Sequence, residues 1–137
     1  EYVVHRGSLH TADTHGEAMA ILRDMGLADK AETKASQLTQ VDLRKLELAR
    51  AMAARPKLLV SDEAMAGLSA SEVDEVLAIL FRLNQQGITI IMIEHIMQAV
   101  MRFSQRVVCL DAGKIICQGT PTEVVANPEV QRAYLGV

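Results

Sequence analysis

The spacing of apolar and polar residues predicts that helices and strands alternate along most of this chain. The first clear helical period begins at Thr14, where Thr14 and Glu17 have the spacing of a capping box, and Gly26 marks its end. The apolar stripe of this helix consists of Ala18, Ile21, Leu22 and Met25. We therefore expect a short amphipathic helix in this region.

A second helix is predicted over residues 40–54. Thr39 is its expected N-cap, Asp42 lies at the third helical position, and Pro56 follows its end. One side of this helix is expected to carry Leu43, Leu46, Ala49, Arg50 and Ala53.

A strand, a helix and another strand come next. Residues 57–61 are predicted to form a buried strand, Ser69 and Glu72 have capping-box spacing, and residues 88–93 form a second apolar run. The helical stripe between the two runs consists of Val73, Val76, Leu77, Leu80 and Leu83. Such a crossover joins parallel strands, so both strands should end at the same edge of one sheet, where open α/β sheets bind ligands.

The last part of the chain predicts a short helix around Val100–Phe103, a hairpin over about residues 106–118, and two closing helices. Each closing helix has a capping residue followed by proline, at Thr120-Pro121 and Asn127-Pro128. If the hairpin turns at Ala112-Gly113, its two cysteines are not opposite each other: Cys109 then faces Ile116, and Cys117 faces Val108. We expect both cysteines to be buried free thiols.

Composition limits the class of protein. The chain has 137 residues, of which half are hydrophobic, and this suffices for the core of a single globular domain. A net charge of −3 and the lack of a basic run argue against nucleic acid as a partner. The apolar runs are too short to cross a bilayer, and no signal peptide opens the sequence, so a soluble protein is predicted.

Acidic residues and a histidine follow the two predicted strands. Asp62 and Glu63 come directly after the first strand, and Glu94 and His95 follow the second. Phosphoryl transfer needs a carboxylate for Mg²⁺, a group that orients the attacking water, and a donor to the transferred phosphate. Asp62, Glu63 and His95 fit these roles in turn, although an acidic pair after a strand, taken alone, is more often a solvated turn.

The order of these motifs carries a family resemblance. Residues 46–63 read LELARAMAARPKLLVSDE, and they are followed by Ala66-Gly67-Leu68-Ser69 and later by Ile93-Glu94-His95. The sequence from about residue 25 onward resembles the ATP-binding cassette ATPases, with a Walker B region, a D-loop and a switch histidine. The closing stretch, residues 119–136, is similar to the end of ATPases from branched-chain amino acid importers.

The resemblance implies an α/β fold, a partial P-loop NTPase fold with mainly parallel strands, flanking helices and a C-terminal β-hairpin. It implies that Asp62 serves Mg²⁺ through water, that Glu63 is the catalytic glutamate, and that His95 reaches the terminal phosphate of ATP. The D-loop, residues Ala66, Gly67, Leu68 and Ser69, would cross the interface between two ATPase subunits. Residues 1–55 would end the helical subdomain, and residues 56–137 would form the core with the Walker B, D-loop and H-loop motifs.

The signature motif of the family aligns with Leu38-Thr39-Gln40-Val41-Asp42. By resemblance, Thr39, Gln40, Val41 and Asp42 would receive the nucleotide of the partner subunit. Thr39 keeps a hydroxyl at a helix N-terminus, which suits phosphate, but Val41 replaces a glycine and Asp42 adds a negative charge. An equal alternative is that Thr39 and Asp42 form only a helix cap. Ala64 and Ser69 are milder departures, in place of the usual Pro and Asp.

A larger departure is the lack of a phosphate-binding loop: no Gly-x-x-x-x-Gly-Lys-Ser/Thr run is present. We therefore expect a piece of a longer subunit that is inactive alone. In the complete protein, the resemblance implies ATP hydrolysis for amino acid import by two ATPase subunits, like or unlike, beneath membrane permease subunits on the cytoplasmic face. The alternative is a non-catalytic interaction or regulatory domain with a degenerate form of this fold.

Overall fold

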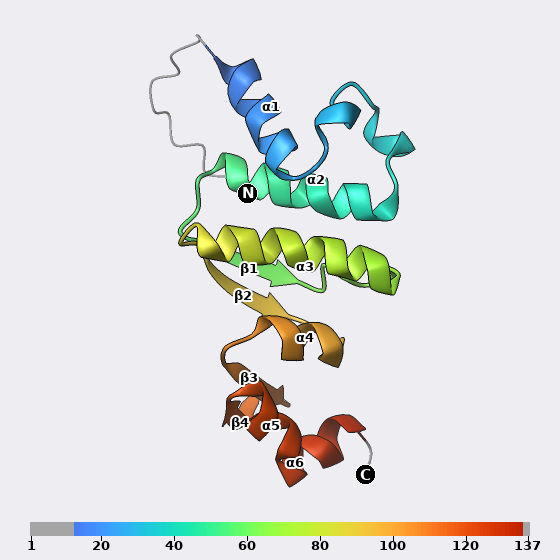
Figure 1. Ribbon diagram of the computed structural model, residues 1–137. Coiled ribbons are helices and arrows are strands. Elements are labelled where there is room, and N and C mark those ends of the chain that lie inside the picture. Colours follow the sequence, from blue (N-terminus) through green and yellow to red (C-terminus); the bar gives the residue numbers. More distant parts are fainter. Residues whose placement is uncertain (1–12, 136–137) are drawn as a thin grey trace. The chain divides into compact units, whose positions relative to one another are not determined.

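The computed structural model describes residues 13–135. His5 and His10, to which the sequence assigns no metal-binding role, lie outside this range. The chain divides into two compact units, Glu1–Pro56 and Lys57–Val137. Figure 1 labels the α-helices and strands of each unit. The variant signature motif lies in the first unit, and Asp62, Glu63 and His95 lie in the second.

The first unit pairs helix α1 (Thr14–Asp24) with helix α2 (Gln40–Ala53). Two short 3-10 turns join them, η1 (Ala28–Lys30) and η2 (Ala35–Gln37). The prediction of Thr14 as the cap of α1 is wrong by one residue. Asp13 is the N-cap, and its carboxylate accepts a hydrogen bond from the Gly16 N–H at 3.1 Å. Glu17, the expected capping partner, instead pairs with Arg55 at 3.0 Å.

The core of the first unit differs in part from the predicted stripes. Met25 and Leu27 are 2% exposed, whereas Ala18 is exposed. In α2 the buried residues are Val41, Asp42, Leu48 and Ala49, while Leu43 is 38% exposed. Both sides of α2 carry apolar residues, so the sequence pattern did not specify which side is buried.

The second unit begins with the predicted parallel pair of strands, β1 (Leu58–Asp62) and β2 (Thr89–Ile93). Their register pairs Leu58 with Thr89 and Asp62 with Ile93, so the two strands end together. The prediction of a buried strand holds for one face only. Leu59 and Ser61 are buried, whereas the alternate positions of both strands are about half exposed: Leu58, Val60, Ile91 and Ile93.

Helix α3 (Ala70–Gln85) connects the two strands and lies along them in Figure 1. Ser69 and Glu72 form the predicted capping box, and Gly87 follows the helix with a φ of 94°. The predicted apolar stripe is buried throughout: Val73, Val76, Leu77, Leu80 and Leu83. A helix with one continuous buried stripe anchors the sheet from one side.

Helix α4 (Met97–Phe103) follows β2, and the rings of Phe103 and Phe81 lie 5.0 Å apart, joining α4 to α3. The hairpin of β3 (Val107–Asp111) and β4 (Lys114–Gly119) comes next. The chain then forms α5 (Pro121–Ala126), α6 (Pro128–Val130) and a π-helical turn, η3 (Gln131–Leu135). Both predicted Pro-initiated helices are confirmed, with Thr120 and Asn127 as their N-caps.

The hairpin register corrects one prediction. The turn is at Ala112-Gly113, where both residues have positive φ, and Leu110 is opposite Ile115 as expected. The register then shifts between Cys109 and Leu110, so Cys109 is opposite Cys117 rather than Ile116. An extra residue in one strand moves every later pair by one position. The two cysteines, which the sequence placed apart, therefore lie side by side, and both are free thiols, of which Cys109 alone is buried.

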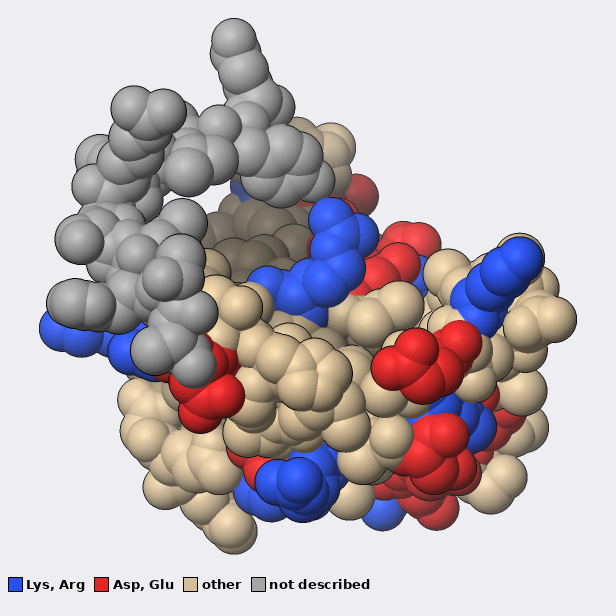
Figure 2. Space-filling view, turned by 90° about the horizontal axis from the view of Figure 1, so that it is seen from above, with Lys and Arg blue, Asp and Glu red and all other residues tan. Residues whose placement is uncertain are grey.

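The surface of the described residues carries both signs of charge. On the face drawn in Figure 2, Lys and Arg side chains are interspersed with Asp and Glu rather than gathered in one patch. Within residues 13–135, no helix has the length and apolar character needed to span a membrane.

Candidate active site

The acidic pair Asp62-Glu63 stands at the point where β1 ends. Glu63 has a φ of 46°, a left-handed conformation that is uncommon for residues other than glycine. Its N–H donates to the carbonyl of Ile93, the last residue of β2, at 2.9 Å. This hydrogen bond joins the ends of the two strands. Such backbone conformations are found preferentially at functional sites.

His95 lies close to Glu63 because their strands are neighbours and end together. The distance from His95 Nδ1 to Glu63 Oε1 is 3.9 Å, which is within ion-pair range but longer than a hydrogen bond. Both side chains are nearly two-thirds exposed, at 63% and 64%. A carboxylate and an imidazole thus lie close together and are open to solvent.

Asp62 offers a carboxylate for a cation. Its side chain is exposed, and among the described residues it forms no hydrogen bond or ion pair. No cluster of three or more His, Cys, Asp or Glu residues suited to a metal occurs within residues 13–135. A single free carboxylate fits Mg²⁺ that keeps most of its water and binds substrate phosphates, and it does not fit a cation enclosed by protein ligands.

Glu94 is a site residue to which the sequence assigned no role. One of its oxygens, Oε1, accepts a hydrogen bond from the Met65 N–H at 3.0 Å, and the other, Oε2, is buried without a partner. Met65 itself is fully buried. Glu94 therefore fixes the segment after Glu63 to the end of β2, directly beside His95. An acid immediately before the histidine is the only sequence signal for this contact.

The segment Ala66–Ser69 leads from this edge into α3. Gly67 has a φ of 77°, and the Leu68 N–H closes a turn onto the Met65 carbonyl at 3.2 Å. Ser69 then caps α3, and its hydroxyl donates to the Glu72 carboxylate at 2.7 Å. The hydrogen bonds from the Ser69 hydroxyl and N–H lower the pKa of Glu72. The role of Ser69 in this structure is to begin the helix.

The variant signature lies in the first unit, at the start of α2. The Thr39 hydroxyl donates to Asp42 Oδ2 at 2.6 Å, and Lys30 Nζ is 2.7 Å from the same oxygen. Gln40 is exposed at the first position of the helix. Val41 is only 8% exposed, so its side chain points into the protein rather than across the helix N-terminus.

The charge of Asp42 is compensated inside the protein. Burial alone raises the pKa of Asp42, but hydrogen bonds from Lys30 and Thr39 outweigh burial and hold the pKa below its ordinary value. Asp42 is thus a carboxylate neutralised by Lys30, and it adds little repulsion toward an anion near Thr39. The contacts of Thr39 and Asp42 are those of a helix capping box, which is the alternative that the sequence left open.

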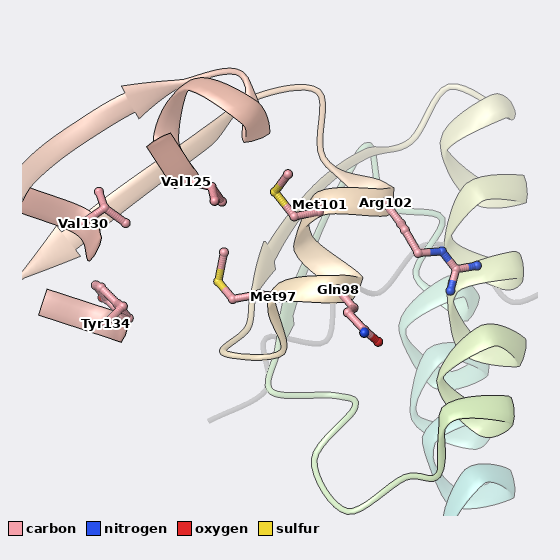
Figure 3. A pocket seen from close by; sticks show the side chains of 7 residues that line it. All are labelled: Met97, Gln98, Met101, Arg102, Val125, Val130 and Tyr134. Carbon is pink, nitrogen blue, oxygen red and sulfur yellow. The ribbon is translucent and has the colours of Figure 1, made fainter. Parts of the chain in front are cut away.

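An apolar groove of about 490 Å³ lies elsewhere in the second unit. Figure 3 shows Met97 and Met101 of α4 directed toward Val125, Val130 and Tyr134 of the C-terminal helices. None of the predicted site residues lines this groove. The polar edge at Asp62, Glu63 and His95 is therefore a separate feature.

Comparison with known proteins gives consistent matches. Residues 114–137 match a family described as branched-chain amino acid ATP-binding cassette transporter. The chain is 41% identical over 116 residues to the high-affinity branched-chain amino acid transport ATP-binding protein LivG of Salmonella typhimurium, with 84% of this chain and 46% of LivG covered. The corresponding protein BraF of Pseudomonas aeruginosa is 37% identical over the same shares.

Solved structures agree with these relatives. The chain superposes on the ADP conformation of MJ1267, an ATP-binding cassette of an ABC transporter, with a TM-score of 0.83 and 27% identity. That match covers 89% of this chain and 50% of MJ1267. The chain thus spans about half the length of the relatives it matches.

Proposed function

The chain belongs to the ATP-binding cassette family of transport ATPases, and from this premise we propose that it is part of an ATP-hydrolysing importer subunit. The transported solutes are branched-chain amino acids, as the names of LivG and BraF and the matching family suggest. Hydrolysis takes place at the polar edge formed by Asp62, Glu63 and His95. The observation that carries this proposal is the 3.9 Å approach of His95 to Glu63 at the joint end of two parallel strands.

Each of these residues has one task in the proposed reaction. Glu63 orients the attacking water and accepts its proton at a carboxylate oxygen, which is open to solvent. His95 donates a hydrogen bond to the phosphoryl group as it is transferred. Asp62 would hold Mg²⁺, which when bound neutralises charge on the phosphates. Glu94, which precedes His95, accepts a hydrogen bond from the Met65 N–H and so holds the segment after Glu63 close to His95.

The other proposed sites act between subunits. Thr39, with Gln40, Val41 and Asp42, presents the N-terminus of α2 to the nucleotide of a second ATPase subunit. Residues Ala66–Ser69 form the D-loop at the interface between the two subunits. In this proposal residues 1–55 belong to the helical subdomain and residues 56–137 to the catalytic core, and the pair works beneath membrane permease subunits on the cytoplasmic face.

The proposal also concerns ATP binding by this chain alone. Because its sequence has no Gly-x-x-x-x-Gly-Lys-Ser/Thr run, backbone donors for the phosphates must come from the rest of the subunit. The free carboxylates at the polar edge repel a triphosphate that has no such donors. We expect the 137-residue chain to bind ATP–Mg²⁺ weakly in calorimetry, and micromolar binding would contradict this part of the proposal.

The experiment for the metal role is an Mg²⁺ titration of ATP hydrolysis by the complete subunit. Asp62→Asn should shift the titration to higher Mg²⁺, because the cation loses its anionic ligand. Asp111→Asn is a matched control, since Asp111 is also an exposed aspartate at the end of a strand. An unchanged Mg²⁺ dependence in Asp62→Asn, or an equal shift in both variants, would contradict the role of Asp62.

A further inference from the structure

The two cysteines of the chain form a neighbouring pair across the hairpin. Cys109 of β3 is opposite Cys117 of β4, so the two side chains leave the same face of the ladder. Directly opposite residues of antiparallel strands have Cα atoms about 4.5–5.5 Å apart, within the range of about 4.4–6.8 Å that a disulfide spans. The pairing of these cysteines therefore has the spacing that a disulfide requires.

The face that carries the pair is covered by the C-terminal helices. Cys109 is 8% exposed and packs with Val124 and Val130, which are 2% and 4% exposed. Cys117 packs against the same cluster but is only partly buried. One thiol is thus sealed in the core, while its neighbour is within reach of a small molecule from solvent.

We propose that Cys109 and Cys117 form a redox modification site, at which hydrogen peroxide converts the two thiols into an intramolecular disulfide. This site is separate from the polar edge, and the proposal does not depend on ATP hydrolysis. The order of reaction follows from accessibility, because the attacking sulfur must reach the peroxide.

The chemistry has two steps. The Cys117 thiolate attacks one peroxide oxygen, the O–O bond breaks, and the products are a Cys117 sulfenic acid and hydroxide, which takes up a proton to become water. The Cys109 thiol then attacks the sulfenic sulfur and displaces a second water, which carries away its proton. Two thiols are oxidised to one disulfide, and one peroxide is reduced to two waters.

The environment supports this order. Burial raises the pKa of the Cys109 thiol, so Cys109 is a poor first nucleophile. It remains a suitable second one, because the sulfenic sulfur is formed directly opposite it. The Tyr134 hydroxyl donates to the Leu110 carbonyl at 2.5 Å and also contacts the Cys109 thiol, so the turn η3 lies against Cys109.

The test is peroxide treatment of the dilute 137-residue chain, followed by peptide mapping without reductant. We expect a linked Cys109–Cys117 peptide that is two hydrogen atoms lighter than the sum of its parts, and its loss on addition of dithiothreitol. Both thiols should become resistant to alkylation together. Separate oxidation of either cysteine to a sulfinic acid, or a disulfide only between two chains, would overturn the proposal.

Stability provides a second measurement. The oxidised chain should unfold at a temperature several degrees higher than the reduced chain, because the cross-link restricts the unfolded state. Cys117→Ser, which changes the more exposed cysteine, should fold but show no such rise after the same treatment. An equal shift in Cys117→Ser would show that the effect has another cause and would also count against the pair.

Discussion

Replacement of Asp42 by asparagine should destabilise the first unit, because Asp42 is a buried charge on which several contacts converge. Its side chain is 4% exposed and binds Lys30 at 2.7 Å and the Thr39 hydroxyl at 2.6 Å. An asparagine side chain at this position would retain the shape of the aspartate but remove the negative charge that Lys30 binds. The substitution therefore isolates the contribution of the charge.

The magnitude follows from two contributions. The hydrogen bonds from Thr39 lose their charged acceptor and weaken, which costs about 1 kcal/mol. The ion pair with Lys30 is worth about 1 kcal/mol, because the lysine side chain is 38% exposed and water screens it. We therefore expect Asp42→Asn to lower the free energy of unfolding by about 2 kcal/mol at neutral pH, and Lys30→Met to lower it by about half as much.

The pH dependence has a definite sign. Because the folded state lowers the pKa of Asp42 below its ordinary 3.8, its contribution is complete above that value. The contribution is lost as the pH falls through the lowered pKa of the folded state. The difference between wild type and Asp42→Asn should thus be constant from about pH 7 to about pH 5 and shrink in stronger acid.

Urea unfolding of the chain, with both single variants and the double variant, measures these values. Asp29→Asn is the control, because Asp29 is exposed on η1. The reasoning is refuted if Asp42→Asn is no less stable than the control, if the double-mutant cycle shows no coupling between Lys30 and Asp42, or if acid leaves the difference unchanged.

Three further predictions concern the second unit. Leu80→Ala should lower the free energy of unfolding by about 2–5 kcal/mol, because Leu80 is fully buried, and a loss below about 1 kcal/mol would contradict its place in the core. Ser61→Ala should leave stability unchanged or raise it by about 1 kcal/mol in the same urea assay, since the buried Ser61 hydroxyl has no partner, and a clear loss would show a missed contact. Glu94→Ala should reduce turnover by the complete subunit about tenfold at unchanged nucleotide affinity, because Met65 loses its acceptor. Glu94→Gln should retain most turnover, and equal losses in both variants would refute the proposed contact.

The sequence predicted those features that are decided over a few residues. The N-cap at Thr39, the capping box at Ser69 and the two Pro-initiated helices follow from local hydrogen bonding, and the structure contains them all. The cap of α1 was misplaced because Asp13 and Thr14 are both good capping residues, and only the backbone decides between them.

Features decided by tertiary packing could not be predicted in this way. The register shift at Cys109 brings both cysteines onto the face covered by Val124 and Val130. The sequence of the hairpin alone does not indicate that its register shifts at this point. The sequence indicated that Glu63 and His95 follow parallel strands. It could not indicate their separation, or the contact of Glu94 with Met65, because both depend on how the chain turns after each strand.

The most direct test of the proposed site compares ATP binding and steady-state ATP hydrolysis in the complete subunit, paired with its partner subunit, for Glu63→Gln and wild type. The glutamine preserves the size of the side chain but cannot accept the proton of the attacking water. We predict unchanged ATP binding with turnover lower by roughly 10²–10⁴, while the control Glu129→Gln behaves as wild type. Near-wild-type turnover by Glu63→Gln would contradict the proposal and would instead favour a non-catalytic role for this fold.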